Sequence, residues 1–332
     1  MTRASFGALD GTPIESISIG GEGLAAEVLT YGAILRRLTF PVRGVRRDLV
    51  LHFDSLEEYV RDRAYVGSLV GRFGNRIGGA TFVENGRRHV LSANEGPNHL
   101  HGGMLGFGKR VWRVLENDAQ SLTLGYTSPA GEEGYPGNLE ARLELRVGAS
   151  TLDIVLTAQC DAPTPVNLTW HPYFNLNAGH ARATDQFLRI PASRYLPVVA
   201  GLIPTGEFAS VEGSPFDFRA ARRLAPPDIA THPQLSLAGG YDHCWLLDED
   251  ADCVCELSSA DRDLALRMHG SGPGLQFYNG QFLARSHPAL GAGVILEPQG
   301  LPNAPNEPAF PNSLLLPGET YRATIQYELN AS

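Results

Sequence analysis

The sequence has almost no lysine, few cysteines and no long apolar run. Lys109 is the only lysine among 27 basic residues, and the formal net charge is −9. No basic stripe is available to follow a phosphate backbone, so nucleic acid is not an expected partner. No apolar stretch approaches the roughly 18 residues that a membrane-spanning helix needs, so no membrane partner is expected.

The cysteines indicate a reducing environment. Three of the four lie in apolar or alternating segments, which favours buried thiols over disulfides: Cys160, Cys244, Cys253 and Cys255. The Cys253-x-Cys255 pair has no second cysteine pair with which to form a zinc site. The first residues lack the apolar core of a signal peptide. We therefore expect a cytoplasmic protein.

Alternation of apolar and polar residues is the dominant pattern along the chain. It runs through 139–147, resumes over 152–160 after Gly148-Ala149-Ser150, and returns over 321–329. Such segments are typical of half-buried antiparallel strands. With 37 glycines and 23 prolines, the composition also favours many short strands joined by turns.

Helical signals are few. Ser55 and Glu58 form a capping-box pattern that predicts a short helix to about Arg63, and Pro226-Pro227 limit 222–231 to a turn or two. No repeat, linker or change of composition divides the chain. The sequence predicts an all-β protein with a few short helices, folded as one large antiparallel β-sandwich in a single domain, 1–332.

Two motifs suggest other chemistry. Gly21-x-Gly23-x-x-Ala26 matches a dinucleotide-binding pattern, but no βαβ unit follows it, so a hairpin turn is the better interpretation. His99-x-His101 could supply two metal ligands, but no carboxylate ligand follows within the next residues. We therefore predict no metal and no cofactor.

Polar and aromatic residues concentrate in five places where a strand pattern breaks. These are the stretches 71–79, 94–103, 166–176, 239–246 and 293–299. In the last of them, a hydrophobic strand runs directly into Glu297, although an unpaired carboxylate is costly to bury. Any one stretch alone has an ordinary structural explanation.

Together the five stretches resemble the aldose 1-epimerase (galactose mutarotase) family over essentially the whole chain and in the correct order. The motifs that carry the resemblance are Asn75-Arg76, Asn98-x-Leu100-His101-Gly-Gly, His171-x-Tyr173-Phe-Asn-Leu, Tyr241-Asp242-His243, Gln276-Phe-Tyr-x-Gly280 and Glu297-x-Gln299. The resemblance implies the family's "supersandwich" of antiparallel strands. Gly74 and Trp170 depart from the family pattern beside the expected pocket. Trp170 could offer an apolar face to a sugar or pack in the core.

The resemblance implies interconversion of the α and β anomers of free aldoses such as glucose or galactose. Glu297 would act as the base on the anomeric hydroxyl and His171 as the acid on the ring oxygen, with His101 supporting the ring-oxygen side. The remaining sugar hydroxyls would be held by binding residues, namely Asn75, Arg76, Tyr173, Asp242 and Gln276. Glutamate and histidine suit these roles because burial and neighbours can bring both pKa values towards neutrality.

Three other functions remain open at this point. A non-catalytic sugar-binding sandwich would keep Arg76 and Asp242 but would not need a buried Glu–His pair. An inverting glycoside hydrolase would use two carboxylates, for which Asp242 and Glu297 are candidates. A relative acting on hexose 6-phosphates would need further basic residues near the pocket, and the sequence does not place them. The expected partner is a monosaccharide, and the chain is expected to be a monomer or a homodimer.

Overall fold

Alternating sequences form the longest strands of the structure, a computed structural model that describes residues 2–178, 182–225, 228–288 and 290–332. In strand β13, the side chains from Leu139 to Val147 are alternately buried and exposed, as the sequence predicts. Strand β13 pairs in antiparallel register with β14 (Thr151–Cys160), placing Leu143 opposite Leu156. Because Leu143 is fully buried, its replacement by alanine would cost about 2–5 kcal/mol.

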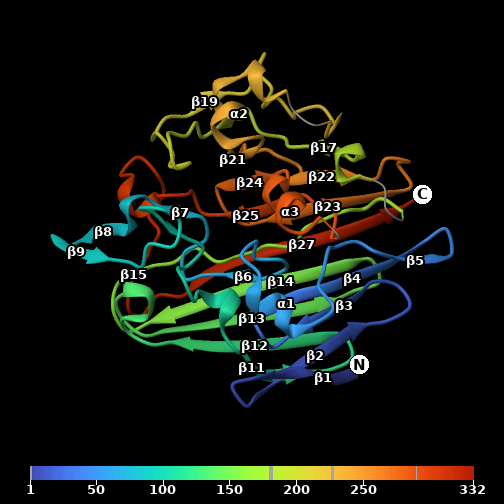
Figure 1. Ribbon diagram of the computed structural model, residues 1–332, viewed down its shortest axis with the longest axis horizontal. Helices are drawn as coiled ribbons and strands as arrows, with labels where there is room; N and C mark the ends of the chain where they lie inside the picture. The colour runs from blue at the N-terminus through green and yellow to red at the C-terminus, as the bar shows by residue number, and fades with distance from the viewer. Residues whose placement is uncertain (1, 179–181, 226–227, 289) are drawn as a thin grey trace.

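The largest sheet has nine strands, and the C-terminal strand lies at its centre (Figure 1). Strand β27 pairs with β14 on one side and with β23 on the other. In spatial order the strands are β11 (Arg113–Asn117), β12 (Ser121–Ser128), β13 (Leu139–Val147), β14 (Thr151–Cys160), β27 (Tyr321–Ala331), β23 (Leu264–Gly270), β22 (Cys255–Ser258), β17 (Phe187–Arg189) and β20 (Arg222–Arg223).

Two five-stranded sheets form the other layer. The first consists of β1 (Thr2–Leu9), β2 (Thr12–Gly20), β3 (Ala25–Leu29), β4 (Ile34–Val42) and β5 (Val45–Asp48). The second, in spatial order, consists of β19 (Ala209–Ser210), β18 (Arg194–Tyr195), β21 (Asp242–Leu246), β24 (Gly274–Tyr278) and β25 (Ile295–Gln299). One apolar cluster joins buried residues of both five-stranded sheets to those of the nine-stranded sheet. The predicted antiparallel sandwich is therefore confirmed.

Short pairs of strands and helices complete the described structure. The two-stranded pairs are β6 (Leu69–Val70) with β16 (Thr169–Trp170), β7 (Arg76–Ile77) with β10 (His99–Leu100), β8 (Thr81–Glu84) with β9 (Arg87–Val90), and β15 (Thr164–Pro165) with β26 (Leu314–Leu315). The α-helices are α1 (Leu56–Arg61), α2 (Pro233–Ala238) and α3 (Gln281–Ser286). None of the helices in the described ranges has the length and apolarity needed to cross a bilayer.

The smaller sequence predictions have mixed outcomes. The glycines at 21 and 23 lie in the turn between the antiparallel strands β2 and β3, so the hairpin interpretation is confirmed. A single 3₁₀ turn covers Ile229–Thr231, whereas Pro226 and Pro227 lie outside the described residues. The four cysteines are free, and all but Cys160 are buried.

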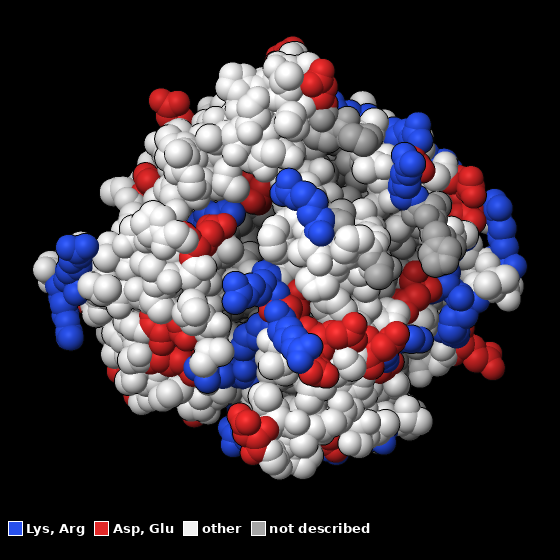
Figure 2. Space-filling model, viewed as in Figure 1, with Lys and Arg blue, Asp and Glu red and all other residues white. Residues whose placement is uncertain are grey.

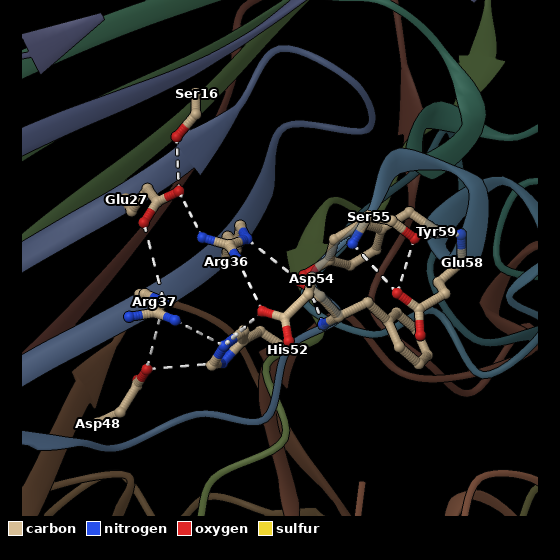
Figure 3. A network of polar contacts seen from close by, with 11 residues as sticks. Ser16, Glu27, Arg36, Arg37, Asp48, His52, Asp54, Ser55, Glu58 and Tyr59 are labelled. Carbon is tan, nitrogen blue, oxygen red and sulfur yellow. Dashed lines mark hydrogen bonds and ion pairs between the residues drawn. The ribbon is translucent and has the colours of Figure 1, made fainter. Parts of the chain in front are cut away.

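A polar network fixes helix α1 to the first five-stranded sheet (Figure 3). Arg36 donates hydrogen bonds to Glu27 at 2.8 Å and to Asp54 at 3.1 Å, which ties strands β3 and β4 to the segment before the helix. The predicted capping box between Ser55 and Glu58 then starts the helix. The chain leaving α1 leads directly to the candidate site, so this network anchors one of its walls.

Candidate active site

A cavity of about 1030 Å³ opens on the face shown in Figure 2, where acidic and basic side chains gather around the middle of the molecule. All eight residues predicted from the sequence line it: Asn75, Arg76, His101, His171, Tyr173, Asp242, Gln276 and Glu297. They come from segments spread over more than 200 positions of the chain, yet the fold brings them to one place.

The second five-stranded sheet supplies three of these side chains from adjacent strands. Gln276 on β24 lies opposite Glu297 on β25. The Gln276 Nε2 atom donates a hydrogen bond to Oδ1 of Asp242, on strand β21, at 2.6 Å. The sheet therefore places a carboxylate, an amide and a second carboxylate side by side on one wall of the cavity.

Glu297 is 1% exposed, and its Oε1 atom has no hydrogen-bond partner within the described part of the chain. Burial raises the pKa of this carboxyl well above its ordinary value. The neighbouring Asp242 raises that pKa further, and Arg76 lowers it. A carboxyl in this setting accepts and releases a proton closer to neutral pH than an exposed glutamate does.

His171 follows strand β16, and its backbone N–H donates a hydrogen bond to the carbonyl of Ser68 at 3.0 Å. Burial lowers the pKa of its imidazole to about 3, and its Nδ1 atom has no partner among the described residues. His101 lies beside it, with ring centroids 5.2 Å apart. The backbone N–H of Asn75 donates to Nδ1 of His101 at 3.1 Å. A neutral His101 therefore carries its proton on Nε2 and can donate it into the cavity.

The same three residues are also the group that could hold a metal ion. Ligand atoms of His101, His171 and Glu297 all lie within 4.8 Å of one another, and two imidazoles with one carboxylate suit several transition metals. His99 does not belong to this group. Its ring nitrogens face the Ser92 carbonyl and the Tyr135 hydroxyl, each at 2.7 Å. The sequence alternative of a His99–His101 ligand pair is therefore wrong.

Arg76 is held by two carboxylates. It makes a bidentate ion pair with Glu95, at 2.7 and 2.8 Å, and its Nη2 also lies 3.3 Å from Asp242. The side chain is 8% exposed, and these partners raise the pKa of the guanidinium, so it stays charged. Glu95 was not predicted from the sequence. Its position within the polar stretch 94–103 was the available signal, because a buried arginine needs a carboxylate partner.

Two sequence expectations about aromatic residues are refined. The Tyr173 hydroxyl donates a hydrogen bond to the Ala64 carbonyl at 2.9 Å, so this residue lines the cavity with its hydroxyl already engaged. Trp170 packs in the main apolar cluster, and its Nε1 donates to the Ala33 carbonyl at 3.0 Å. Of the two possibilities left open for Trp170, core packing is the one that the structure has.

Comparisons with known proteins agree with this fold and cavity. Residues 15–328 match the family described as aldose 1-epimerase. The chain is 37% identical to galactose mutarotase from Bos taurus, covering 100% of this chain and 99% of that protein. It is 34% identical to aldose 1-epimerase from Escherichia coli K12, covering 97% of each.

Solved structures agree as well. An aldose epimerase homologue from C. elegans superposes with a TM-score of 0.86 at 30% identity, covering 95% of this chain and 98% of that one. Galactose 1-epimerase from Lactobacillus acidophilus also has a TM-score of 0.86, at 28% identity, covering 100% and 98%. The fold and its cavity define a carbohydrate isomerase built on a β-sandwich. The chain belongs to the aldose 1-epimerase family.

Proposed function

We propose that this aldose 1-epimerase acts on free hexoses such as glucose and galactose, with Glu297 as the base and His171 as the acid. The observation that carries the proposal is the buried carboxylate and imidazole that face one cavity within 4.8 Å of each other, together with His101. Polarimetry on freshly dissolved α-glucose, α-galactose and other aldoses tests it. Rates no faster than the spontaneous reaction for every sugar would overturn it.

The proton balance fits this pair. With the sugar ring closed, the reactive form of the pair holds its one proton on His171, so that Glu297 is a carboxylate and His171 an imidazolium. As the bond between C1 and the ring oxygen breaks, the anomeric hydroxyl proton moves to Glu297 and the His171 proton moves to the ring oxygen. An open-chain aldehyde and two neutral side chains result. Because burial disfavours both charges, it favours this ring opening.

Ring closure uses the same two transfers in reverse. Rotation about the C1–C2 bond presents the other face of the aldehyde to the C5 hydroxyl. Glu297 then returns its proton to the aldehyde oxygen, while His171 takes the proton from the attacking hydroxyl. The other anomer forms and the charged pair is restored, so this route consumes no cofactor.

The remaining polar groups of the cavity are suited to binding hydroxyls. The Oε1 atom of Gln276 has no partner within the described ranges, so it can accept from a sugar hydroxyl. Asn75 uses its backbone N–H and its Oδ1 within the protein. Its amide nitrogen donates to no group in the described ranges, so it can donate to a sugar hydroxyl. His101 would donate from Nε2 towards the ring-oxygen side. The Tyr173 hydroxyl already donates to the Ala64 carbonyl, so it can bind a sugar hydroxyl only as an acceptor.

The alternatives from the sequence are not favoured. Asp242 accepts hydrogen bonds from both Arg76 and Gln276, one on each carboxylate oxygen. An acceptor held in this way suits hydroxyl binding better than the general-acid role that an inverting glycosidase requires. The catalytic relatives at full length likewise favour an enzyme over a sugar-binding module.

Arg76 and Asp242 are expected to bind substrate rather than to transfer protons. Removing a hydrogen bond to a charged group costs about 1.5–3 kcal/mol, so Arg76→Gln or Asp242→Asn should raise KM by roughly 10- to 100-fold, with a smaller fall in kcat. Steady-state polarimetry measures both constants. Arg189→Gln, which changes an arginine paired with Asp252 away from the cavity, is the matched control. An unchanged KM for every aldose would remove the altered residue from the binding set.

We expect activity without a metal, although three potential ligands converge. Enzyme treated with a chelator and freed of it should convert α-galactose to equilibrium as fast as untreated enzyme, because the two proton transfers need only Glu297 and His171. Metal analysis should accompany the assay. Loss of activity that zinc or manganese restores would show that His101, His171 and Glu297 are ligands and would refute the acid–base scheme.

We further propose that residues 1–332 act as one domain in the cytoplasm, as a monomer or homodimer, without binding nucleic acid. The cavity draws its lining from Leu9 to Glu297, which supports a single functional unit. The free cysteines support a reducing compartment. Sedimentation, limited proteolysis, cell fractionation and a nucleic-acid mobility assay test these four statements.

A further inference from the structure

We propose that Tyr65 is a positioning residue for this reaction, whose ring holds the imidazoles of His101 and His171 in place by bridging the two segments that carry them. The inference rests on the proposed roles of those histidines. Nothing in the sequence motifs singles out Tyr65. The case for it comes from its ring contacts, its backbone conformation and its hydroxyl partner.

The Tyr65 ring touches both imidazoles. Its centroid lies 4.7 Å from that of His101 and 5.8 Å from that of His171, with the rings inclined at 62° and 52°. The two imidazoles are also edge-on to each other. Tyr65 lines the cavity together with both histidines. Inclined aromatic pairs of this kind attract each other beyond the effect of the area that they bury.

The backbone at Tyr65 is held in an unusual conformation. Its φ is +57°, in a left-handed region that a bulky residue rarely adopts and that strains the backbone. The buried carboxylate of Asp62 accepts hydrogen bonds from the N–H groups on either side, those of Ala64 at 2.7 Å and Val66 at 2.8 Å. These two bonds fix the turn that directs the Tyr65 side chain into the cavity.

The same turn is bonded to the backbone of His171. The Gly67 N–H donates to the His171 carbonyl at 3.1 Å, and the His171 N–H donates to the Ser68 carbonyl at 3.0 Å. The Tyr173 hydroxyl adds a bond to the Ala64 carbonyl. A shift of the turn that carries Tyr65 would therefore also shift His171.

The Tyr65 hydroxyl reaches the segment that carries His101. It accepts a hydrogen bond from Nδ2 of Asn94 at 3.2 Å. Asn94 also holds Leu100, next to His101, by a bond to its carbonyl at 2.9 Å and one from its N–H at 2.7 Å. Tyr65 thus links the turn that is bonded to His171 with Asn94, which holds the segment that carries His101. The ring makes the direct contacts with the imidazoles, and the hydroxyl contributes one of several bonds on the His101 side.

Removal of the ring should therefore affect the chemical step. In Tyr65→Leu both imidazoles lose the aromatic ring that packs against them. Misplacement of a reacting group can cost up to about 10²-fold in rate. We expect kcat to fall by roughly 10- to 100-fold with KM changed less than about threefold. Tyr65→Phe keeps the ring and should stay within about threefold of the wild-type kcat.

A pH profile separates positioning from simple loss of stability. Burial holds the pKa of His171 down at about 3. Water admitted by Tyr65→Leu would relieve part of that effect and raise the pKa of His171. The acid limb of the kcat/KM profile should therefore move to higher pH. Nitrogen NMR of the imidazoles, recorded without substrate, should show greater exchange broadening for His101 and His171 than in the wild type.

Two further variants complete the test. Tyr65→Asn removes the ring but keeps a residue that tolerates positive φ, so it reports on the ring if Tyr65→Leu does not fold. Tyr126→Leu, at a half-buried tyrosine outside the cavity, controls for loss of packing and should keep the wild-type kcat and pH profile. A wild-type kcat in ring-deleted Tyr65 variants, or a raised KM with unchanged kcat, overturns the positioning role. An inactive wild-type enzyme overturns the proposed function instead.

Discussion

Glu297→Gln should lower kcat by roughly 10²- to 10⁴-fold, because glutamine keeps the shape of the side chain but cannot accept a proton at neutral pH. Folding and sugar binding should survive, since the substitution removes a buried titratable group without opening a cavity. The measurement is polarimetry on α-galactose, corrected for the spontaneous rate, with circular dichroism to confirm the fold.

A matched carboxylate tests whether the effect is specific to the site. Glu328 lies half-buried on strand β27, beside His269 and outside the cavity, so Glu328→Gln should leave kcat unchanged. If Glu297→Gln retains most of its activity, Glu297 is not the base. Asp242 would then become the candidate carboxylate, and the glycosidase and binding-module interpretations would have to be reconsidered.

His171→Asn should give a loss of similar size, since the ring oxygen would leave without receiving a proton. The losses in His171→Asn and Glu297→Gln should not add in the double variant, because both groups act in one ring-opening step. His269→Asn, a half-exposed histidine on strand β23 outside the cavity, is the matched control. Additive losses would mean that the two residues act in separate steps.

The pH dependence should follow from the number of protons that the pair holds. The working pair carries one proton in total, and it titrates with apparent pKa values that belong to the pair. When the pair takes up a second proton, at His171, the reaction stops. Burial lowers the pKa of His171, so this acid limb of the profile lies below the usual range of histidine. When the pair loses its last proton, at high pH, the reaction stops as well. Burial raises the pKa of Glu297, so this alkaline limb lies above the usual range of glutamate. The kcat/KM profile should be a broad bell. His171→Asn should keep only the fall at low pH, where Glu297 becomes protonated, and Glu297→Gln only the fall at high pH, where His171 loses its proton.

The sequence predicts the fold well wherever one face of a strand meets solvent. Alternation over 139–147 and 152–160 predicts strands β13 and β14 nearly to the residue, because each polar residue marks the outer face. The strands of the second five-stranded sheet are less regular. Strand β25 is buried at all five positions, so no alternation is available to mark its faces. Its position beside β24 depends on long-range pairing that one sequence does not reveal.

The sequence predicted residues that line one cavity, but not the contacts between them. All of these residues except Gln276 lie where a strand pattern breaks; the family resemblance supplied Gln276 and the role of each residue. Tyr65 and Asp62 carry no such signal, because a positive φ and a pair of backbone hydrogen bonds arise only from the folded chain. Glu95 became recognisable once Arg76 was seen to be buried. Supporting residues of this kind can be identified only from the three-dimensional structure.

The central position of strand β27 has a consequence for how the protein is made. The ribosome produces this strand after both of its neighbours, β14 and β23. Until Tyr321 and the residues after it emerge, each neighbour presents an unpaired edge to its surroundings. Open strand edges are templates for pairing with other chains, and pairing across about 170 positions is slow. The nascent chain therefore passes through a period in which it needs protection from aggregation. Strand β27 ends that period, and it also joins the two halves of the nine-stranded sheet.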